Sequence, residues 1–477
     1  GAGELRCRWV PPVPGAAPAA RPAMPLPESP FRSPALAALD AAARALLAPG
    51  FWALNQLLDL RPTTAERRRR RQSPCGWCRG CAAWALAGPV LAVLLLLSLP
   101  VTALGLLLWL PLQAARSPFV YQHTAAAAPA KPWDLRQRRT FTFLSANLCL
   151  LPSGLAKFSN LGQTPQRAAD IARQLPPPLS ESFPPDADIL CLQEVFDAAA
   201  ATCLRRRLGR VFPHIISEVG TGGLCRGRLR LLGSGLFLAS RFPVLAAAFH
   251  SFPNGAREDA MADKGLLLVQ VLLGSARHRR VVGYIGCTHL QAPAGDGAVR
   301  EAQLTLALRW LQQFQQEQEQ SGDVVAFDVL CGDLNFDNCS PDQLNQRHQL
   351  FKVYQDPCRR APGAPIPCCS CPMLCPPALS PPVSHRHCPP HPCRTLSSPS
   401  GRRQFLAGPI LTSGQPDATF PGPWRGRRLD YVVFRPRPPM TPLSPQDVAA
   451  VSFITRLAMC SDHLPVALSL HVVPGAP

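Results

Sequence analysis

The alternation of apolar and polar positions separates an N-terminal part of the chain from a longer C-terminal part. From about Phe141, short apolar runs rich in Val, Leu, Ile and Phe alternate with turns and with segments of helical spacing. Apolar runs of this length predict strands that are buried on at least one face. They are FTFLSANL (141–148), ADILCLQEV (187–195), SGLFLAS (234–240), LLLVQVLL (266–273), VVGYIGCTHL (281–290), VVAFDVLCGDLN (324–335), RLDYVVF (428–434) and LPVALSL (464–470).

Two segments between these runs have the periodicity of helices. They are TPQRAADIARQL (164–175) and VREAQLTLALRWLQQFQQ (299–316), and in the second Leu304, Leu308 and Leu311 fall on one face. Strands that alternate with such helices predict a layered α/β domain over residues 141–473.

A long apolar segment precedes this domain. Residues 80–115 contain no charged side chain, and a helix that spans a membrane needs only about 20 apolar residues. The segment therefore predicts membrane association, with a buried core helix as the less favoured alternative. Gly88-Pro89, Pro100 and Pro111 interrupt it, which favours a helix with a broken return, or a re-entrant hairpin, over one long tilted helix.

The flanks of the apolar segment define the other N-terminal regions. Residues 46–60, LLAPGFWALNQLLDL, suit either a helix in the membrane interface or core packing, and the run Arg67 to Arg71 suits a cytosolic, anionic lipid surface. Residues 46–116 are thus predicted to be membrane-associated, and 117–140 a linker. Residues 1–45 are rich in Ala, Pro and Arg and are expected to be a disordered or non-native extension, with a transit peptide as the alternative.

The cysteines favour thiols over disulfides. Cys75, Cys78 and Cys81 lie beside the apolar segment and are candidates for acylation, with inert thiols or an incomplete zinc site as alternatives. The chain has 19 cysteines in total, and most of the others are scattered, several of them in apolar strands, as buried reduced thiols would be.

Composition narrows the partners. The chain has 49 Lys and Arg against 30 Asp and Glu, a formal charge of +19 that favours an anionic partner, either nucleic acid or an acidic membrane face. Its 55 prolines favour one large core with irregular flanks. The Cys- and Pro-rich insert 361–410 is expected to be irregular, although its cysteines and histidines also suit zinc.

Polar side chains gather where the predicted strands end. Each has a structural alternative, such as a loop cap for Asn147, the first acidic residue of a helix for Glu194, or a satisfied core position for His289. Ligands and catalytic groups in layered α/β folds collect at one set of strand ends, so the whole set predicts one site. The residues are Asn147, Glu194, His289, Asp333, Asn335, Asp430, Asp462 and His463.

The residue types favour metal-assisted phosphoryl chemistry. Glu194 and Asn147 offer hard oxygen ligands of the kind that Mg²⁺ prefers. Asp333 and Asn335 lie on one strand face and can hold a water and a phosphate oxygen. His463 can accept the proton of that water. In addition, Asp430 can fix the tautomer of His463 and His289 can donate to a non-bridging oxygen, which leaves the group that protonates the leaving alkoxide open.

These motifs carry a resemblance to a known family. SANLCL, LCLQEVFD, GCTHL, CGDLNFDN, RRLDYV and SDHLPV occur in the order found in the DNase-I-like endonuclease/exonuclease/phosphatase superfamily. The apolar N-terminus together with FSNLGQTPQRAADI, SGLFLASRFPV and VVGYIGCTHLQAP resembles the membrane-bound neutral sphingomyelinases, in particular the mitochondria-associated type. The resemblance implies a four-layer α/β sandwich preceded by a hydrophobic membrane-associated region.

The resemblance also implies a function. It implies cleavage of sphingomyelin to ceramide and phosphocholine, with Mg²⁺ (or Mn²⁺) at Glu194 and catalysis by His463. It further implies two segments that dip into a mitochondrial or endoplasmic reticulum membrane, a cytosolic catalytic domain and activation by anionic phospholipids, with no nucleic-acid partner. Asp259 and Lys264 of REDAMADKG would switch the site on and off, where the residues alone predict a surface loop. A nuclease or phosphoinositide phosphatase of the same superfamily, or an inactive membrane scaffold, are the alternatives.

Overall fold

A computed structural model describes most of the two predicted regions. It describes residues 25–63, 76–124, 137–175, 187–357 and 429–473, apart from short gaps within the last two ranges, and a few residues between the ranges. The insert 361–410 and Cys75 lie outside the described residues, as do the side chains of Cys78 and Cys81.

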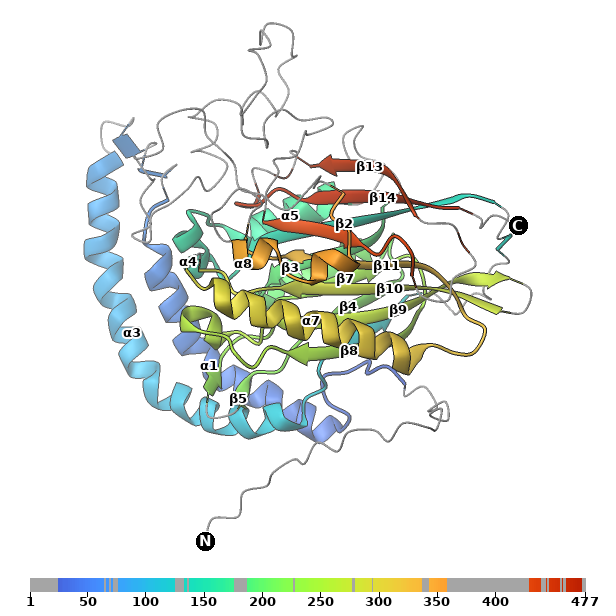
Figure 1. Ribbon diagram of the computed structural model, residues 1–477. Coiled ribbons are helices and arrows are strands. Elements are labelled where there is room, and N and C mark those ends of the chain that lie inside the picture. The colour runs from blue at the N-terminus through green and yellow to red at the C-terminus, as the bar shows by residue number, and fades with distance from the viewer. Residues whose placement is uncertain are drawn as a thin grey trace, which may run out of the picture.

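Two large sheets form the centre of the molecule (Figure 1). The seven-stranded sheet has the order β1-β4-β7-β3-β2-β14-β13, and the five-stranded sheet the order β12-β11-β10-β9-β8. In the first sheet the strands are β1 (Val120–His123), β2 (Arg139–Leu150), β3 (Ala187–Val195), β4 (His214–Ser217), β7 (Phe237–Ser240), β13 (Asp447–Phe453) and β14 (Val466–Val472). In the second they are β8 (Val244–Ser251), β9 (Gly265–Ala276), β10 (Arg279–His289), β11 (Val324–Asp333) and β12 (Asp430–Phe434).

The sheets bury their facing surfaces against each other. Apolar side chains from both sheets, among them Phe143, Ile189, Val269 and Val329, form one continuous cluster. All ten residues of β11 are buried, Asp328 and Asp333 included, which is the reason that its apolar residues follow one another instead of alternating with exposed polar ones.

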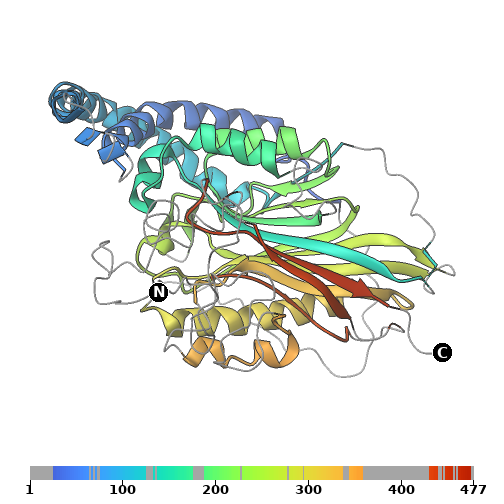
Figure 2. The same cartoon turned by 90° about the horizontal axis from the view of Figure 1, so that it is seen from above.

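Helices cover the two outer faces. The helices α5 (Thr164–Gln174) and α6 (Ala198–Leu208) pack on the seven-stranded sheet through residues such as Ile171 and Leu204. The helix α7 (Gly297–Gln318) packs on the five-stranded sheet through Leu304, Leu308 and Leu311, with short α8 (Gln343–Gln346) and α9 (Leu350–Val353) beside it. The order helix, sheet, sheet, helix confirms the predicted four-layer sandwich (Figure 2).

The linker prediction for residues 117–140 is wrong in part. Residues Val120–His123 form β1, which pairs antiparallel with β4 at the edge of the large sheet, and β2 already begins at Arg139. The run is too short and too mixed in polarity to give a strand signal by itself, since only Val120 and Tyr121 are buried.

Two long helices make up the N-terminal region. The helix α1 (Pro34–Asp59) begins inside the range expected to be an irregular extension, and α3 (Gly76–Leu112) is continuous and followed by the 3₁₀ turn η1 (Gln113–Ala115). The interrupted form predicted for the apolar segment is therefore not what the structure shows. Because Pro89, Pro100 and Pro111 are each eleven residues apart, about three helical turns, they lie on one face and curve the helix in one direction without breaking it.

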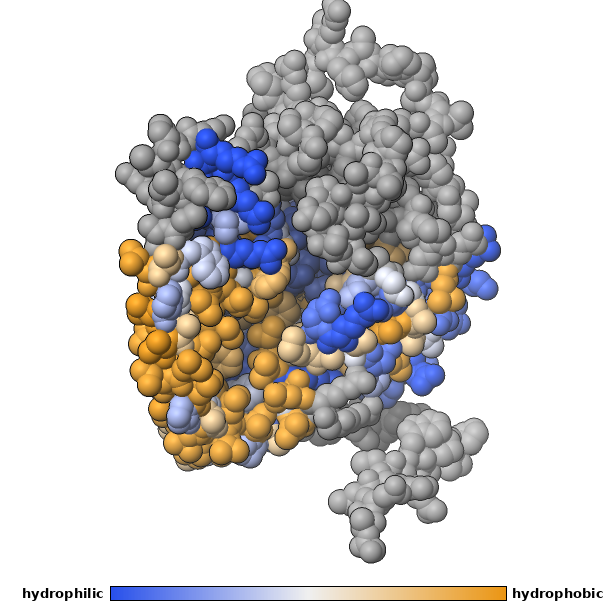
Figure 3. Space-filling view, turned by 90° about the vertical axis from the view of Figure 1, so that its left-hand side faces the viewer, coloured by the Kyte–Doolittle hydropathy of each residue, from blue (hydrophilic) through white to orange (hydrophobic). Residues whose placement is uncertain are grey.

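Small residues allow α1 and α3 to pack closely. A Cβ at Gly50 would lie 2.2 Å from the hydroxyl oxygen of Thr102, and one at Gly105 would lie 3.0 Å from atoms of Leu46 and Leu47. The outer side of α3 is exposed, with Leu86, Leu97 and Leu107 each at least 70% accessible. Residues Trp84–Ala115 are long and apolar enough to cross a membrane, and a broad hydrophobic area covers this face of the molecule (Figure 3).

Candidate active site

The predicted site residues meet at one edge of the sandwich. The strands β2 and β3 are parallel, as are β10 and β11, so their carboxyl ends reach the same edge. The amide of Asn147 at the end of β2 joins the sheets, since its Nδ2 donates to Glu194 Oε1 at 2.8 Å and to Asp333 Oδ2 at 3.0 Å. The sequence prediction of a single constellation agrees with this arrangement.

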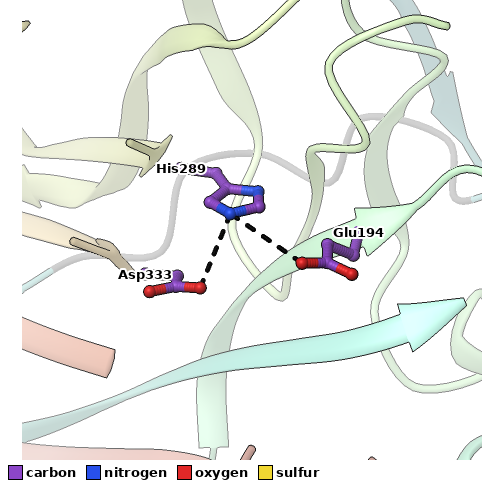
Figure 4. Close-up of side chains that lie close together, drawn as sticks. All are labelled: Glu194, His289 and Asp333. Carbon is purple, nitrogen blue, oxygen red and sulfur yellow. Dashed lines mark ion pairs between the residues drawn. The ribbon is translucent and has the colours of Figure 1, made fainter. Parts of the chain in front are cut away.

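His289 lies between two carboxylates (Figure 4). Its Nε2 is 3.5 Å from Asp333 Oδ2 and 3.9 Å from Glu194 Oε1. The Nε2 atom also lies 3.1 Å from the ammonium of Lys264, which can only donate. The proton of a neutral His289 is therefore on Nδ1, which has no hydrogen-bond partner among the described residues. Burial, followed by the charges of Lys264 and His463, holds the pKa of His289 well below its usual range, so the ring is neutral.

Lys264 connects the site to the segment that carries Asp259. Its ammonium lies 2.9 Å from Asp259 Oδ1 and donates to the carbonyl of Leu290 at 2.9 Å. Asp259 lies in the 3₁₀ turn η3 (Arg257–Met261), and its second carboxylate oxygen accepts from the backbone N–H of Ala292 at 2.6 Å. Lys264 is buried, so the surface-loop interpretation of this segment is wrong at that residue.

His463 is held by a second carboxylate. Its Nδ1 lies 2.7 Å from Asp430 Oδ2, and its Nε2 lies 3.8 Å from Asp333 Oδ2. Burial by itself would lower the pKa of His463, but the nearby charges of Asp430 and Asp333 outweigh it and hold the pKa well above its usual range. The hydrogen bond from Nδ1 leaves Nε2 directed at the centre of the site, as the tautomer prediction for Asp430 requires.

The carboxylates themselves are close enough to affect one another. Burial, with the charges of Asp430 and Glu194, raises the pKa of Asp333 to about 7, although His463 and Asn147 act in the opposite direction. Burial and the charge of Asp462 likewise raise the pKa of Glu194. Both carboxyl groups therefore hold a proton more readily than usual, and a bound cation would stabilise their ionised forms.

The donor set fits a divalent metal ion. Ligand atoms of Glu194, His289 and Asp333 all lie within 4.8 Å of one another, and so do those of Asp333, Asp430 and His463. Carboxylate oxygens suit Mg²⁺, and the imidazole nitrogens extend the choice to Mn²⁺. Asn147 is oriented differently from the prediction, because its Oδ1 accepts from the N–H of Cys149 at 3.0 Å and its amide N–H groups face the carboxylates. Its role as a metal ligand therefore stays a prediction.

Asn335 and Asp462 lie at the rim of the constellation. The Asn335 amide donates to the Leu290 carbonyl at 2.9 Å, and its backbone N–H donates to Asp333 Oδ1 at 3.0 Å. The backbone of Asn335 has φ 55°, and that of Glu194 has φ 58°. Left-handed backbone at non-glycine residues costs of order 1–3 kcal/mol and tends to occur at functional sites.

Arg167 is a supporting residue that the sequence reasoning did not single out. It lies in α5 and is almost completely buried. Its guanidinium donates to the carbonyls of Leu148 and Cys149, which follow Asn147, and to that of Cys460, which precedes the segment of His463. It thereby joins two segments that carry site residues. Its position inside the TPQRAADI motif is the signal that was available.

Known proteins match the two parts of the chain. A family model for the neutral sphingomyelinase N-terminal transmembrane region matches residues 35–115, and one for the endonuclease/exonuclease/phosphatase family matches residues 144–463. Sphingomyelin phosphodiesterase 5 of Mus musculus is 43% identical over 93% of this chain and 94% of its own length. The chain belongs to the neutral sphingomyelinase family.

Other relatives also match this neutral sphingomyelinase family member over most of their own length. Sphingomyelin phosphodiesterase 3 of Homo sapiens is 30% identical over 94% of this chain and 99% of its own length. Sphingomyelinase C from Streptomyces griseocarneus superposes with a TM-score of 0.40 at 18% identity, over 69% of this chain and 99% of that chain. The chain is therefore a hydrolytic enzyme by family, and the sequence-based resemblance is confirmed.

Proposed function

We propose that this chain is a Mg²⁺-dependent phosphodiesterase of the phospholipase C type, which hydrolyses sphingomyelin to ceramide and phosphocholine at a membrane surface. The observation that carries the proposal is the 43% identity to a sphingomyelin phosphodiesterase along nearly the whole chain, membrane region included. The converging carboxylates and histidines support it, because they suit an in-line displacement at phosphorus.

Glu194 and Asp333 are the residues that would hold the metal ion. Asn147 would be a third ligand with its amide rotated by 180°, so that Oδ1 instead of Nδ2 faces the carboxylates. A bound Mg²⁺ would supply positive charge where negative charge develops on the phosphoryl oxygens. Glu194 is suited to this role because its carboxylate remains partly accessible, with 19% of the side chain exposed.

His463 is assigned to the attacking water. The oxygen of that water forms a bond to phosphorus while the bond from phosphorus to the ceramide oxygen breaks, and Nε2 of His463 accepts the proton of the water. Asp430 keeps Nδ1 protonated, so that Nε2 carries the lone pair. The raised pKa of His463 favours its protonated form, which cannot accept a proton. Positive charge bound beside Asp333 would lower this pKa and so favour the neutral, basic form. Asp462 lies beside His463 in the chain and adds its charge to the site.

His289 and Asn335 are assigned to the phosphoryl oxygens. A donor at His289 Nε2 requires a proton on that atom, whereas Lys264 donates to it here. We therefore assign Asp259 and Lys264 to regulation: with Lys264 on His289 the site is not arranged to donate, and a shift of Lys264 frees Nε2. The amide of Asn335 lies near His289, since it donates to the carbonyl of Leu290, the residue that follows His289.

The membrane region sets where the enzyme acts. The exposed apolar surface of α3 would hold the catalytic domain on the cytosolic face of a mitochondrial or endoplasmic reticulum membrane, with sphingomyelin as substrate and anionic phospholipids as activators. The positive charge of the chain is then matched to lipid and not to nucleic acid. Cys75, which precedes α3 in the chain, and Cys78 and Cys81, which lie in its first two turns, remain candidates for acylation.

The test is release of phosphocholine from sphingomyelin in mixed micelles that contain an anionic phospholipid, with Mg²⁺, with Mn²⁺ and with chelator. The native chain is compared with His463→Ala and with His471→Ala, a histidine that pairs with Thr140 at the opposite end of β14. We expect divalent-dependent release that His463→Ala reduces by at least a factor of about 10² and His471→Ala leaves nearly unchanged.

Phosphatidylcholine, a phosphoinositide and DNA are assayed alongside. Cleavage of one of these in preference to sphingomyelin would assign the site to another activity of the superfamily. Failure to cleave any of them, by a chain that is folded and binds Mg²⁺, would favour the membrane scaffold and contradict the proposal.

A further inference from the structure

A small two-stranded ribbon projects next to the membrane helix. It consists of β5 (Gly223–Cys225) and β6 (Arg228–Arg230) and belongs to neither large sheet. An isolated two-stranded ribbon is marginally stable in water by itself, so its attachments determine how it is placed.

The two faces of the ribbon are different. Gly223 pairs with Arg230, and Leu224 pairs with Leu229, so alternate pairs point to opposite faces. The first pair faces the protein: Arg230 is buried, and its guanidinium forms an ion pair with Asp263 and donates to Ser251 Oγ at 2.6 Å. The second pair faces outward, with Leu224 68% and Leu229 42% exposed.

The ribbon is attached directly to the end of α3. A Cβ placed on Gly222 would lie 2.2 Å from the indole of Trp109, and one on Gly223 would lie 2.9 Å from the side chain of Gln113. Trp109 is buried in this contact, whereas Leu104 and Leu107, two to five residues earlier in α3, are exposed. The two outward leucines therefore continue the exposed apolar surface of a helix that matches a transmembrane-region family model.

The ribbon is also attached to the segment of Asp259. The backbone N–H groups of Leu231 and Leu232 both donate to the carbonyl of Met261, at 2.9 Å and 3.1 Å. Met261, the last residue of η3, is 47% exposed. A third large apolar side chain thus lies near the two leucines and beside the site.

We infer that the ribbon is a second membrane contact, in which Leu224 and Leu229 enter the interface of an anionic bilayer beside α3, with Met261 next to them. Two features favour a lipid surface as the occupant: the continuity of the leucines with α3, and the sequence GLCRGRLR, which adds Arg226 and Arg228 between them. This inference deepens the proposed function, since it rests on action at a membrane surface.

The first test measures contact with lipid without any catalysis. The full chain is reconstituted in vesicles of phosphatidylcholine and phosphatidylserine that lack sphingomyelin, with and without brominated acyl chains. Leu224→Trp, Leu229→Trp and Val448→Trp are each compared with the native chain and its eight tryptophans. Val448 is a matched control because it is 39% exposed and pairs with Leu470, at the end of β14 that is distant from the site.

We expect brominated lipid to quench the added emission of Leu224→Trp and Leu229→Trp, and to leave that of Val448→Trp at the value seen in unbrominated vesicles. Equal quenching in all three variants, or none in the two ribbon variants, would overturn the inference. Because no substrate is present, a quenched ribbon in a chain that fails to hydrolyse sphingomyelin would refute the proposed function and leave the membrane contact standing.

The second test measures the consequence for turnover. In a variant with both Leu224→Ser and Leu229→Ser, we expect hydrolysis of sphingomyelin in anionic vesicles to fall roughly threefold to tenfold through a higher KM for the surface. Hydrolysis of a water-soluble phosphocholine ester should be unchanged. An equal loss on both substrates would indicate a folding defect in place of a docking role and would contradict the inference.

Discussion

Arg167 offers a sharp test of how the active-site edge is held together. The side chain is 8% exposed in spite of its charge, and a buried guanidinium is stable only where its N–H groups find acceptors. Its hydrogen bonds reach both segments that flank the site. The acceptors are the carbonyls of Leu148 (3.2 Å), Cys149 (2.7 Å), Cys460 (2.7 Å) and Gly162 (2.9 Å), and Oγ1 of Thr164 (3.2 Å).

The substitution Arg167→Met removes these donors and keeps much of the aliphatic volume. Three carbonyls at the site edge would lose a charged donor, at a net cost of about 1.5–3 kcal/mol each. Relief from burying the guanidinium charge offsets several kcal/mol of that sum. We therefore expect a loss of about 3 kcal/mol in unfolding free energy, which for a domain of this size corresponds to a fall in Tm of roughly 4–8 °C.

The same substitution should affect catalysis through His463. Cys460 lies three residues before His463, so its release loosens the segment that positions the imidazole. A displacement of about 1 Å in a catalytic group can cost around 10²-fold in rate. We expect kcat to fall between about tenfold and a hundredfold, with a smaller change in KM because the donors and the substrate do not touch.

The assay is thermal unfolding of the full chain in detergent, followed by tryptophan emission, together with initial rates of phosphocholine release. Arg173→Met is the control. Arg173 lies on the same helix, its side chain is 61% exposed, and its ion pair is with Asp170 on the surface of that helix. A surface ion pair of this type contributes about 0–1 kcal/mol. If Arg167→Met behaves like Arg173→Met in both Tm and kcat, the reasoning about the buried donors is refuted.

Three other substitutions test separate parts of the structure. Asp430→Asn should lower kcat by about 10²–10⁴ with little change in KM, because an amide can donate to Nδ1 of His463 and stabilise the wrong tautomer; initial rates check this. Glu194→Gln should raise the Mg²⁺ concentration needed for half-maximal activity, and calorimetric titration of Mg²⁺ should show weaker binding in the absence of substrate. Burial raises the pKa of Asp328 to about 6, so the folded state holds this proton more tightly than the unfolded state, and stability from this group is present below about pH 4 and lost as pH rises to about 6. Asp328→Asn should remove roughly 2 kcal/mol of the change in unfolding free energy between pH 4.5 and pH 7.5, measured by denaturant unfolding at both values, and an unchanged pH dependence would contradict it.

The strand pattern predicted most of the site because the chemistry lies where the pattern stops. All eight predicted runs contain observed strands, and their polar end residues meet because parallel neighbours end at one edge. The hydrogen bond between Asp430 and His463 was also predicted. Strands such as β4 and β13 were missed because they are short or contain few large apolar residues, and their pairing depends on the sheet that receives them.

The contact between Lys264 and His289 shows what local patterns leave out. Lys264 directly precedes β9, and His289 is the last residue of β10; the two strands pair antiparallel from Ala276 and Arg279 outward to Leu266 and Thr288. The register of this hairpin places His289 opposite Gly265, the residue that follows Lys264, so the two residues are diagonal neighbours. The short turn between two apolar runs was visible in the sequence, so counting outward from it would have placed the lysine at the site.

Residues of the N-terminal region form hydrogen bonds and ion pairs with the catalytic domain. The predicted division into a membrane region, a linker and a separate domain therefore does not describe independent units. Asn55 of α1 accepts from the backbone N–H of Gly154 at 2.7 Å, and Glu66 holds the buried ammonium of Lys157 at 2.9 Å. Gly154 and Lys157 lie in α4 (Ser153–Ala156) and η2 (Lys157–Ser159), which directly follow β2, the strand that carries Asn147. At the other end of the membrane region, Arg116 donates to the carbonyl of Gly220 at 2.7 Å, just before the ribbon. Both ends of the membrane region thus contact loops beside the active site, and the orientation of α1 and α3 in a bilayer fixes the side of the sandwich that faces lipid.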